Sequence, residues 1–104
     1  MRKKYIVKEN KDFFKIINDG ECKKNRSFVI YSLENKLLYN RYGISVSKKH
    51  GNAVFRNKYK RKIRAIIDNN KKDYNISKDY IIILRKGAIG KSFIDLTKDY
   101  LQLI

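Results

Sequence analysis

Residues 48–67 read KKHGNAVFRNKYKRKIRAII, and this stretch decides how the rest of the chain is interpreted. From Ala53 onward its apolar residues recur at intervals of three and four, which is the period of one face of an α-helix. The apolar side chains on this common arc are Phe55, Tyr59, Ile63, Ile66 and Ile67. We therefore predict a helix over residues 53–67 that packs its apolar arc against a sheet.

The polar side of this predicted helix carries positive charge alone. Eight Lys and Arg residues and no acidic residue lie between Lys48 and Arg64. A solvent-exposed helix face usually mixes the two signs, because pairs of opposite charge at i,i+4 stabilise the helix. The polar residues form two lines, one of Arg56, Lys60 and Arg64 and the other of Asn57 and Arg61. Such a rigid row of cations is suited to bind phosphate groups.

The whole chain shows the same bias. It has 26 Lys and Arg against 10 Asp and Glu among 104 residues, which gives a formal net charge of +16 and a pI near 10.0. A small folded domain with this self-repulsion is expected to have a polyanionic partner. Nucleic acid is the leading candidate, and an anionic membrane surface is the weaker alternative. The length suits a single domain over residues 1–104.

The composition argues against several kinds of site within the protein. Cys22 is the only cysteine and His50 the only histidine, so neither an internal disulfide nor a zinc site of His and Cys ligands can form. The acidic residues are scattered and absent from the basic region, which disfavours two-metal hydrolysis. His50 has no carboxylate near it in sequence, which disfavours general acid–base catalysis. We therefore expect no catalytic residue and no metal site in the protein.

The apolar segments are all short. The longest apolar run, Tyr80–Leu84, is far too short to cross a bilayer. The first ten residues are charged and lack the apolar segment of a signal peptide. We therefore expect a cytoplasmic protein without membrane attachment.

Helical and strand patterns flank the basic stretch. Upstream, apolar spacing predicts a helix over residues 11–19, beginning at Asn10, and Gly20 stands where a C-terminal glycine cap belongs. Alternating β-branched and aromatic residues predict strands over residues 26–33 and about 38–47.

Downstream, the polar residues 69–78 predict a loop. A continuous apolar run and the glycine that ends it predict a buried strand over residues 79–87. Residues 92–104 predict a helix, which Ser92 opens in a capping-box-like arrangement with Asp95. The order is α-β-β-α-β-α, with room for a short extra strand in residues 21–25. This order predicts an α/β (α+β) two-layer sandwich with one small mixed sheet and about three helices.

Aromatic and small polar residues on the neighbouring elements form a second candidate feature. Phe13 and Ile17 share one face of the first predicted helix, Tyr31 lies on a predicted strand, and Ser45 lies on the next strand. Aromatic side chains beside cations can stack single-stranded bases. Helical spacing is more often a sign of core packing, so the residues alone favour core positions for Phe13 and Ile17.

A resemblance to the protein subunit of bacterial ribonuclease P is carried by residues 41–67, RYGISVSKKHGNAVFRNKYKRKIRAII. KENKDFFKIINDG and RSFVIYSL upstream and KDYIIILRKGA downstream are also similar to the family, so the resemblance covers nearly the whole chain. It implies an α/β sandwich whose βαβ crossover around the basic helix is left-handed, against the usual rule. It also implies that the protein binds a large catalytic RNA and helps to remove the 5′ leader from precursor tRNA.

The resemblance further implies which groups act. It implies an endoribonuclease whose RNA subunit and Mg²⁺ ions carry out the hydrolysis, with no cofactor bound by the protein alone. The implied partners are the catalytic RNA and precursor tRNA, with no obligate protein partner. The positions that would contact the catalytic RNA are Lys48, Lys49, Asn52, Arg56, Asn57, Lys58, Lys60, Arg61 and Arg64. The positions that correspond to the family's cleft for the single-stranded leader are Phe13, Ile17, Val29, Tyr31 and Ser45.

Two positions depart from the family pattern. Lys58 stands at the third position of an Arg-Asn-Arg motif, so bidentate phosphate recognition is lost there although the charge is retained. Ile17 stands where an aromatic residue is common, which weakens the expectation of base stacking at that position. The residues also leave three other functions open: a basic ribosomal or other structural RNA-binding protein, a DNA-binding regulator, and a small nuclease that uses His50.

Overall fold

The computed structural model describes residues 1–71 and 76–104. Its helices and strands are α1 (Asn10–Asp19), β1 (Glu21–Lys24), β2 (Phe28–Glu34), β3 (Arg41–Ser45), α2 (Ala53–Asn69), β4 (Lys78–Leu84) and α3 (Phe93–Leu103). The described residues also form three short 3₁₀ helices: η1 (Lys3–Tyr5), η2 (Lys48–His50) and η3 (Lys86–Ala88). The predicted element order is confirmed, and the extra strand forms as β1. Four residues of the predicted loop at 69–78 lie outside the described residues.

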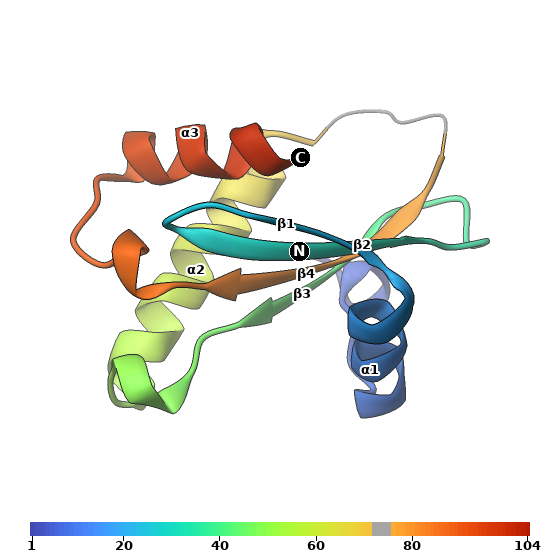
Figure 1. Ribbon diagram of the computed structural model, residues 1–104, viewed down its shortest axis with the longest axis horizontal. Coiled ribbons are helices and arrows are strands. Elements are labelled where there is room, and N and C mark those ends of the chain that lie inside the picture. The colour runs from blue at the N-terminus through green and yellow to red at the C-terminus, as the bar shows by residue number, and fades with distance from the viewer. Residues whose placement is uncertain (72–75) are drawn as a thin grey trace.

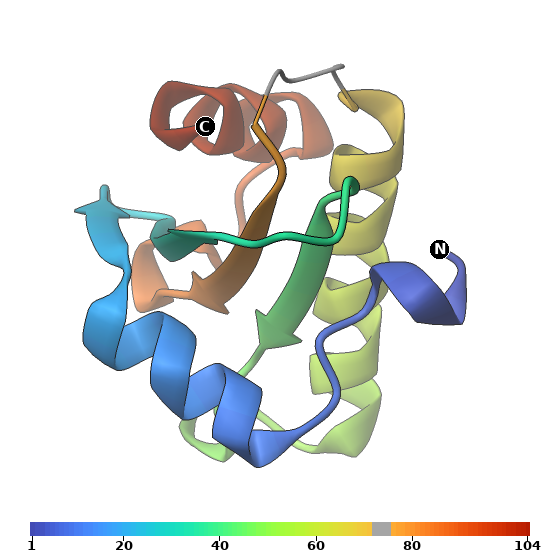
Figure 2. The same ribbon diagram turned by 90° about the vertical axis from the view of Figure 1, so that its right-hand side faces the viewer.

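The strands form one mixed sheet in the order β1-β2-β4-β3. β2 pairs antiparallel with both β1 and β4, whereas β3 pairs parallel with β4. The chain passes from β3 to β4 through α2, and this crossover is left-handed, as the two views of the ribbon show (Figures 1 and 2). The α+β class and the mixed sheet predicted from the sequence are therefore confirmed.

The main core lies between one face of the sheet and the helices α2 and α3. Alternate strand residues such as Phe28, Ile30 and Ile82 point toward this core and are almost fully buried. The helices supply apolar residues in return: Tyr59, Ile63, Ile66, Ile67, Leu96 and Tyr100. Burial of these groups away from water is the main source of stability for the fold.

The opposite face of the sheet is covered only in part. There α1 lies over β2 and β4. Ile16 of α1 packs with Val7 and with Ile81 of β4 in a small second cluster of buried residues. Phe13, Tyr31, Leu33 and Ile83 are only half-buried beside that cluster. Figure 2 shows α1 on the opposite side of the sheet from α3. The half-buried residues beside α1 leave part of this apolar face accessible.

Two predicted helix boundaries have different physical origins. Ser92 accepts a hydrogen bond from the Asp95 N–H at 3.1 Å, so the predicted cap of α3 is confirmed. Gly20 follows α1 as predicted, but its φ of −83° is not that of a left-handed glycine cap. A side chain at Gly20 would collide with the carbonyl oxygens of Ile16 and Ser32. Glycine is needed there because the end of α1 approaches β2 closely.

Two predicted strands are longer than the observed ones. The strand predicted over residues 79–87 ends at Leu84, because residues 86–88 form the η3 turn. The strand predicted over 38–47 shortens to Arg41–Ser45, and Leu38 has a left-handed φ of 67°. Among the helices within residues 1–71 and 76–104, none has the length and apolar character needed to cross a membrane.

Candidate nucleic-acid interface

The entrance of α2 is fixed by two side-chain caps. Ser47 accepts a hydrogen bond from the Lys49 N–H at 3.3 Å and so caps η2, which carries Lys48 and Lys49. Asn52 accepts a hydrogen bond from the Phe55 N–H at 3.0 Å and caps α2 itself. Such caps satisfy donors that a helix start would otherwise leave free. The structure therefore shows Asn52 as the cap of α2, and the contact with RNA that the family resemblance implies for it stays a prediction.

The two sides of α2 match the prediction from the sequence. The predicted apolar arc is buried at Tyr59, Ile63, Ile66 and Ile67 and half-buried at Phe55. The side chains that face solvent include Asn57, Lys58, Arg61 and Arg64. Arg56 and Lys60 lie along the flank of the helix and are half-buried. The apolar contact thus holds the predicted RNA-binding residues on one rigid surface.

Arg56 connects the helix to its entrance. Its Nη1 donates a hydrogen bond to the Gly51 carbonyl at 3.2 Å. A guanidinium has five N–H donors, so the remaining ones stay available for a ligand. This contact directs Arg56 toward the turn that carries Lys48 and Lys49, and these three cations lie at one end of α2.

The cations of this region are not neutralised within the protein. Among the described residues, no carboxylate lies within ion-pair distance of any of the eight Lys and Arg residues between Lys48 and Arg64. Lys62 instead stands over the ring of Tyr59, with its Nζ 4.8 Å from the ring centroid. A helix face that keeps its charges unpaired has a strong positive potential, which attracts polyanions.

The residues predicted to bind a leader lie on the other face of the sheet. Val29 pairs with Ile83, which also pairs with Ser45, so these residues form one row across three strands. Tyr31 lies in the next row, opposite Ile81. Directly paired residues share a face of the sheet, so the strand members of the predicted cleft do come together.

The α1 side of this cleft is formed mainly by Phe13. A Cβ atom built on Gly43 of β3 would lie 2.7 Å from the Phe13 ring, so this ring sits directly over the strand. Ile17, one turn further along α1, is at the exposed edge with 36% of its surface accessible. Phe13 therefore combines the core position that its spacing favours with a place at the cleft. Ile17 lies at the rim.

The structure brings the two predicted sites into contact, which the sequence did not reveal. A cavity of about 100 Å³ is lined by residues of both sites and of the N-terminal segment: Met1, Ile6, Val7, Phe13, Tyr42, Ile44, Lys60 and Arg64. Lys60 and Arg64 come from the basic helix, and Phe13 comes from the cleft. The basic helix and the cleft are thus parts of one continuous surface around the edge strand β3.

Cys22 is a neighbour of the cleft that the sequence did not place there. It pairs with Tyr31 across β1 and β2, and its side chain is exposed. A hydrogen bond with the Cys22 side chain, followed by their charge interaction, raises the pKa of the Tyr31 hydroxyl. The raised pKa favours the protonated form of the Tyr31 hydroxyl, whose oxygen can also accept a hydrogen bond.

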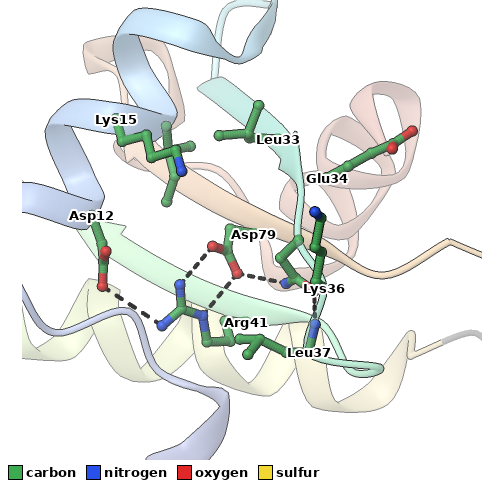
Figure 3. Close-up of a pocket in the computed structure, with 10 residues that line it drawn as sticks. Asp12, Lys15, Leu33, Glu34, Lys36, Leu37, Arg41 and Asp79 are labelled. Atoms are coloured by element: carbon green, nitrogen blue, oxygen red, sulfur yellow. Dashed lines mark hydrogen bonds and ion pairs between the residues drawn. The ribbon is translucent and has the colours of Figure 1, made fainter.

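An ion-pair network that sequence reasoning missed fixes the position of α1. Arg41 donates from Nε and Nη2 to the two carboxylate oxygens of Asp79, at 2.8 and 2.6 Å. The Arg41 Nη1 also lies 3.7 Å from an Asp12 oxygen on α1, and Asn35 donates to Asp79 at 2.7 Å. These groups line a cavity of about 470 Å³ beside α1 (Figure 3). The hydrogen bonds to Asp79 raise the pKa of the Arg41 guanidinium above its ordinary value.

The described residues contain no group of three or more His, Cys, Asp or Glu side chains that could hold a metal ion. His50 is half-buried in the η2 turn. The basic helix and the cleft together present unpaired cations, hydroxyls and aromatic rings. These are the groups that bind a polyanion with unstacked bases.

Comparisons with known proteins agree with this arrangement. The family model for Ribonuclease P matches residues 1–104. A ribonuclease P protein component of Streptococcus pneumoniae (strain Hungary19A-6) is 43% identical over 104 residues, which are 100% of this chain and 85% of the relative. The solved structure of the Staphylococcus aureus RNase P protein is similar with a TM-score of 0.87 and 40% identity, and the match covers 95% of this chain and 91% of that one. For the RNase P protein from Thermotoga maritima the TM-score is 0.84 and the identity 31%, with 92% and 91% of the two chains covered.

Proposed function

The chain belongs to the ribonuclease P protein family, and from this premise we propose how its surface divides the work of binding RNA. As a protein component it is an auxiliary subunit of an endoribonuclease, and its partner is the RNase P RNA. We propose that the basic face of α2 binds this RNA and that the cleft beside α1 binds the 5′ leader of precursor tRNA. The observation that carries the proposal is the set of unpaired cations on a capped, rigid helix.

The basic face supplies contacts to the RNA backbone. Arg61 and Arg64 are exposed and held by a helix whose other side is buried, so little ordering is needed when they meet phosphates. Arg56 and the turn at Lys48 and Lys49 extend the row toward the start of the helix. Lys58 contributes charge without the forked geometry of an arginine. Such contacts position the protein on the RNA without reading its sequence.

The cleft supplies contacts to unpaired nucleotides. Tyr31 offers a half-exposed ring and a protonated hydroxyl, and Phe13 offers a second ring across the sheet face. Val29 and Ser45 form the floor of the same face, one apolar and one able to hydrogen-bond. Stacking of a base on an aromatic side chain contributes about 1 to 3 kcal/mol and tolerates any base. This suits a leader whose sequence differs between precursors.

The proposal assigns hydrolysis to the RNA subunit with Mg²⁺ and assigns no catalytic residue or cofactor to this chain. Three predictions from the sequence stay predictions: that the protein acts on precursor tRNA, that it does so in the cytoplasm, and that it needs no obligate protein partner. The alternative of a structural protein of the ribosome has no separate observation in its favour.

The leader assignment is tested with precursor and mature tRNA, each bound to the reconstituted holoenzyme. We expect Tyr31→Ala to weaken the binding of precursor tRNA by about tenfold, because it removes one stacking surface worth about 1 to 3 kcal/mol. Mature tRNA has no leader and is expected to bind as before. Tyr31→Phe keeps the ring and is expected to retain most of the affinity.

Phe14→Ala serves as the matched control. Phe14 adjoins Phe13 on α1, but its ring is 66% exposed and lies outside the second apolar cluster. Its loss is expected to leave the binding of both tRNAs unchanged. Equal losses for precursor and mature tRNA in Tyr31→Ala would remove the leader from this cleft.

A further inference from the structure

The N-terminal segment carries positive charge that the proposed function does not use. Arg2, Lys3, Lys4 and Lys8 lie within eight residues. The segment is fixed in place, because Ile6 forms a parallel bridge with Tyr42 and the Val7 N–H donates to the Tyr42 carbonyl at 3.0 Å. These cations therefore stand at defined positions along the edge of β3.

Two tyrosine rings hold one of these lysines. Tyr5 and Tyr39 meet edge to face, with ring centroids 5.5 Å apart and an interplanar angle of 80°. The Lys4 Nζ lies 4.9 Å from the centroid of Tyr5 and 5.3 Å from that of Tyr39. The Nζ of Lys71, just beyond α2, lies 5.0 Å from the Tyr5 centroid. An aromatic ring attracts an ammonium group but carries no net charge, so Lys4 is positioned without being neutralised.

The acidic residues around this cluster are already engaged. A cavity of about 220 Å³ is lined by Lys3, Lys4, Ile6, Lys8, Glu9, Asp12, Tyr39 and Arg41. Glu9 pairs with Lys11 at 3.2 Å, and Asp12 lies 3.7 Å from Arg41. Within residues 1–71 and 76–104, no carboxylate forms an ion pair with Lys3, Lys4 or Lys8. The cavity therefore keeps an excess of positive charge.

This cluster continues the basic face of α2. Met1 and Ile6 line the same cavity as Lys60 and Arg64. Figure 2 shows the N-terminal segment running beside α2. The cluster lies at the Arg41 end of β3, whereas the leader cleft includes Ser45 at the other end of that strand. Charge and position thus favour the RNA that the helix binds over the leader.

We propose that Lys3, Lys4 and Lys8 form a phosphate-binding surface that extends the basic face of α2 along the RNase P RNA, with Tyr5 and Tyr39 positioning Lys4. The inference rests on the proposed function of α2. The cluster binds the sugar–phosphate backbone and carries no base specificity, because its ligand groups are ammonium ions.

The test is the affinity of the protein for RNase P RNA without any tRNA, measured over a series of salt concentrations. The triple variant Lys3→Gln/Lys4→Gln/Lys8→Gln is expected to bind more weakly. The slope of log affinity against log salt is expected to become shallower by about 1 for each phosphate that the variant no longer binds. The control removes three exposed lysines from β1, η3 and α3, as Lys23→Gln/Lys86→Gln/Lys98→Gln, and is expected to keep the wild-type slope.

The role of the rings is tested through Lys4. Tyr39→Leu is expected to weaken binding when Lys4 is present and to have no further effect in the Lys4→Gln protein, because the ring acts on RNA only by positioning that lysine. Tyr39→Phe keeps the ring and is expected to bind like wild type. Equal losses from Tyr39→Leu in both backgrounds would overturn the positioning role.

The outcomes separate this inference from the function on which it rests. If the triple variant matches its control while Arg61→Ala weakens binding, the N-terminal surface is wrong and the helix assignment stands. If Arg61→Ala also has no effect, the function proposed for α2 fails as well. A defect that appears only when precursor tRNA is added would assign the N-terminal lysines to the leader and overturn their assignment to the RNase P RNA.

Discussion

Arg41 and Arg64 show two opposite uses of a cation in one small protein. Arg41 makes two hydrogen bonds to Asp79, which is only 6% exposed, and lies near a second carboxylate on α1. Arg64 is exposed on a helix that buries its apolar side, and no described carboxylate pairs with it. A cation paired with a buried carboxylate fixes the fold, whereas an unpaired, exposed cation is available to bind RNA. The position of each cation relative to the acids thus indicates its role.

Removing a paired carboxylate is expected to have the largest effect on stability. Asp79→Ala leaves the half-buried Arg41 without its main partner, and breaking a buried ion pair costs about 3 to 5 kcal/mol. We expect a loss at the lower end of that range, because Arg41 retains Asp12 and is about 20% exposed. Urea unfolding of the free protein measures this loss. A change below about 0.5 kcal/mol would show that the network does not stabilise the fold.

A smaller effect of the same kind is expected at Asp99. The Lys91 Nζ donates to its carboxylate at 2.6 Å, and the Ser27 hydroxyl donates to the same oxygen. The Lys91 hydrogen bond, followed by that of Ser27, lowers the pKa of Asp99 below its ordinary value of 3.8. A lowered pKa in the folded state means that the stabilisation is present above pH 3.8 and is lost as the pH falls through the folded-state pKa.

Unfolding measured between pH 5 and about pH 2 tests this contribution. Wild type is expected to lose stability more steeply than Asp99→Asn as the pH falls below about 4, because the amide cannot titrate. Parallel curves for the two proteins would show that Asp99 gains nothing from Lys91. The eight Lys and Arg residues between Lys48 and Arg64 differ in this respect, because no described carboxylate pairs with any of them.

The smallest effect on stability is expected from the unpaired cations of α2. Arg61→Ala/Arg64→Ala removes no described ion pair, so the free energy of unfolding is expected to change by less than about 0.5 kcal/mol per site. Any change is expected to be favourable at low salt, since the substitutions relieve repulsion. Thermal unfolding at low and moderate salt measures it. A loss as large as that of Asp79→Ala would remove the distinction between the two groups of cations.

The basic helix was predictable because its information is local. The apolar arc from Tyr59 to Ile67 and the absence of acids are both visible within a few turns of sequence. Strand β2 was equally clear, with its two alternating faces. These elements determine the main core and hence most of the fold.

Other elements depend on partners far away in the chain. The four residues of β1, Glu21–Lys24, are all exposed, and the strand forms by pairing with β2 rather than by burying apolar side chains. Arg41 and Asp79 meet only because β3 and β4 pair in parallel in one particular register. The meeting of Phe13 with Lys60 and Arg64 around one cavity likewise requires the assembled fold. Such long-range features cannot be read from residue spacing.

The salt dependence of RNase P RNA binding by Arg61→Ala/Arg64→Ala shows whether the unpaired cations of α2 bind the RNA. We predict that this variant is as stable as wild type but binds the RNA more weakly. Its log–log salt slope is expected to be shallower by about 2, one for each phosphate that the missing arginines would bind. An unchanged slope and affinity in that stable variant would contradict the claim that the unpaired cations of α2 are the RNA-binding surface.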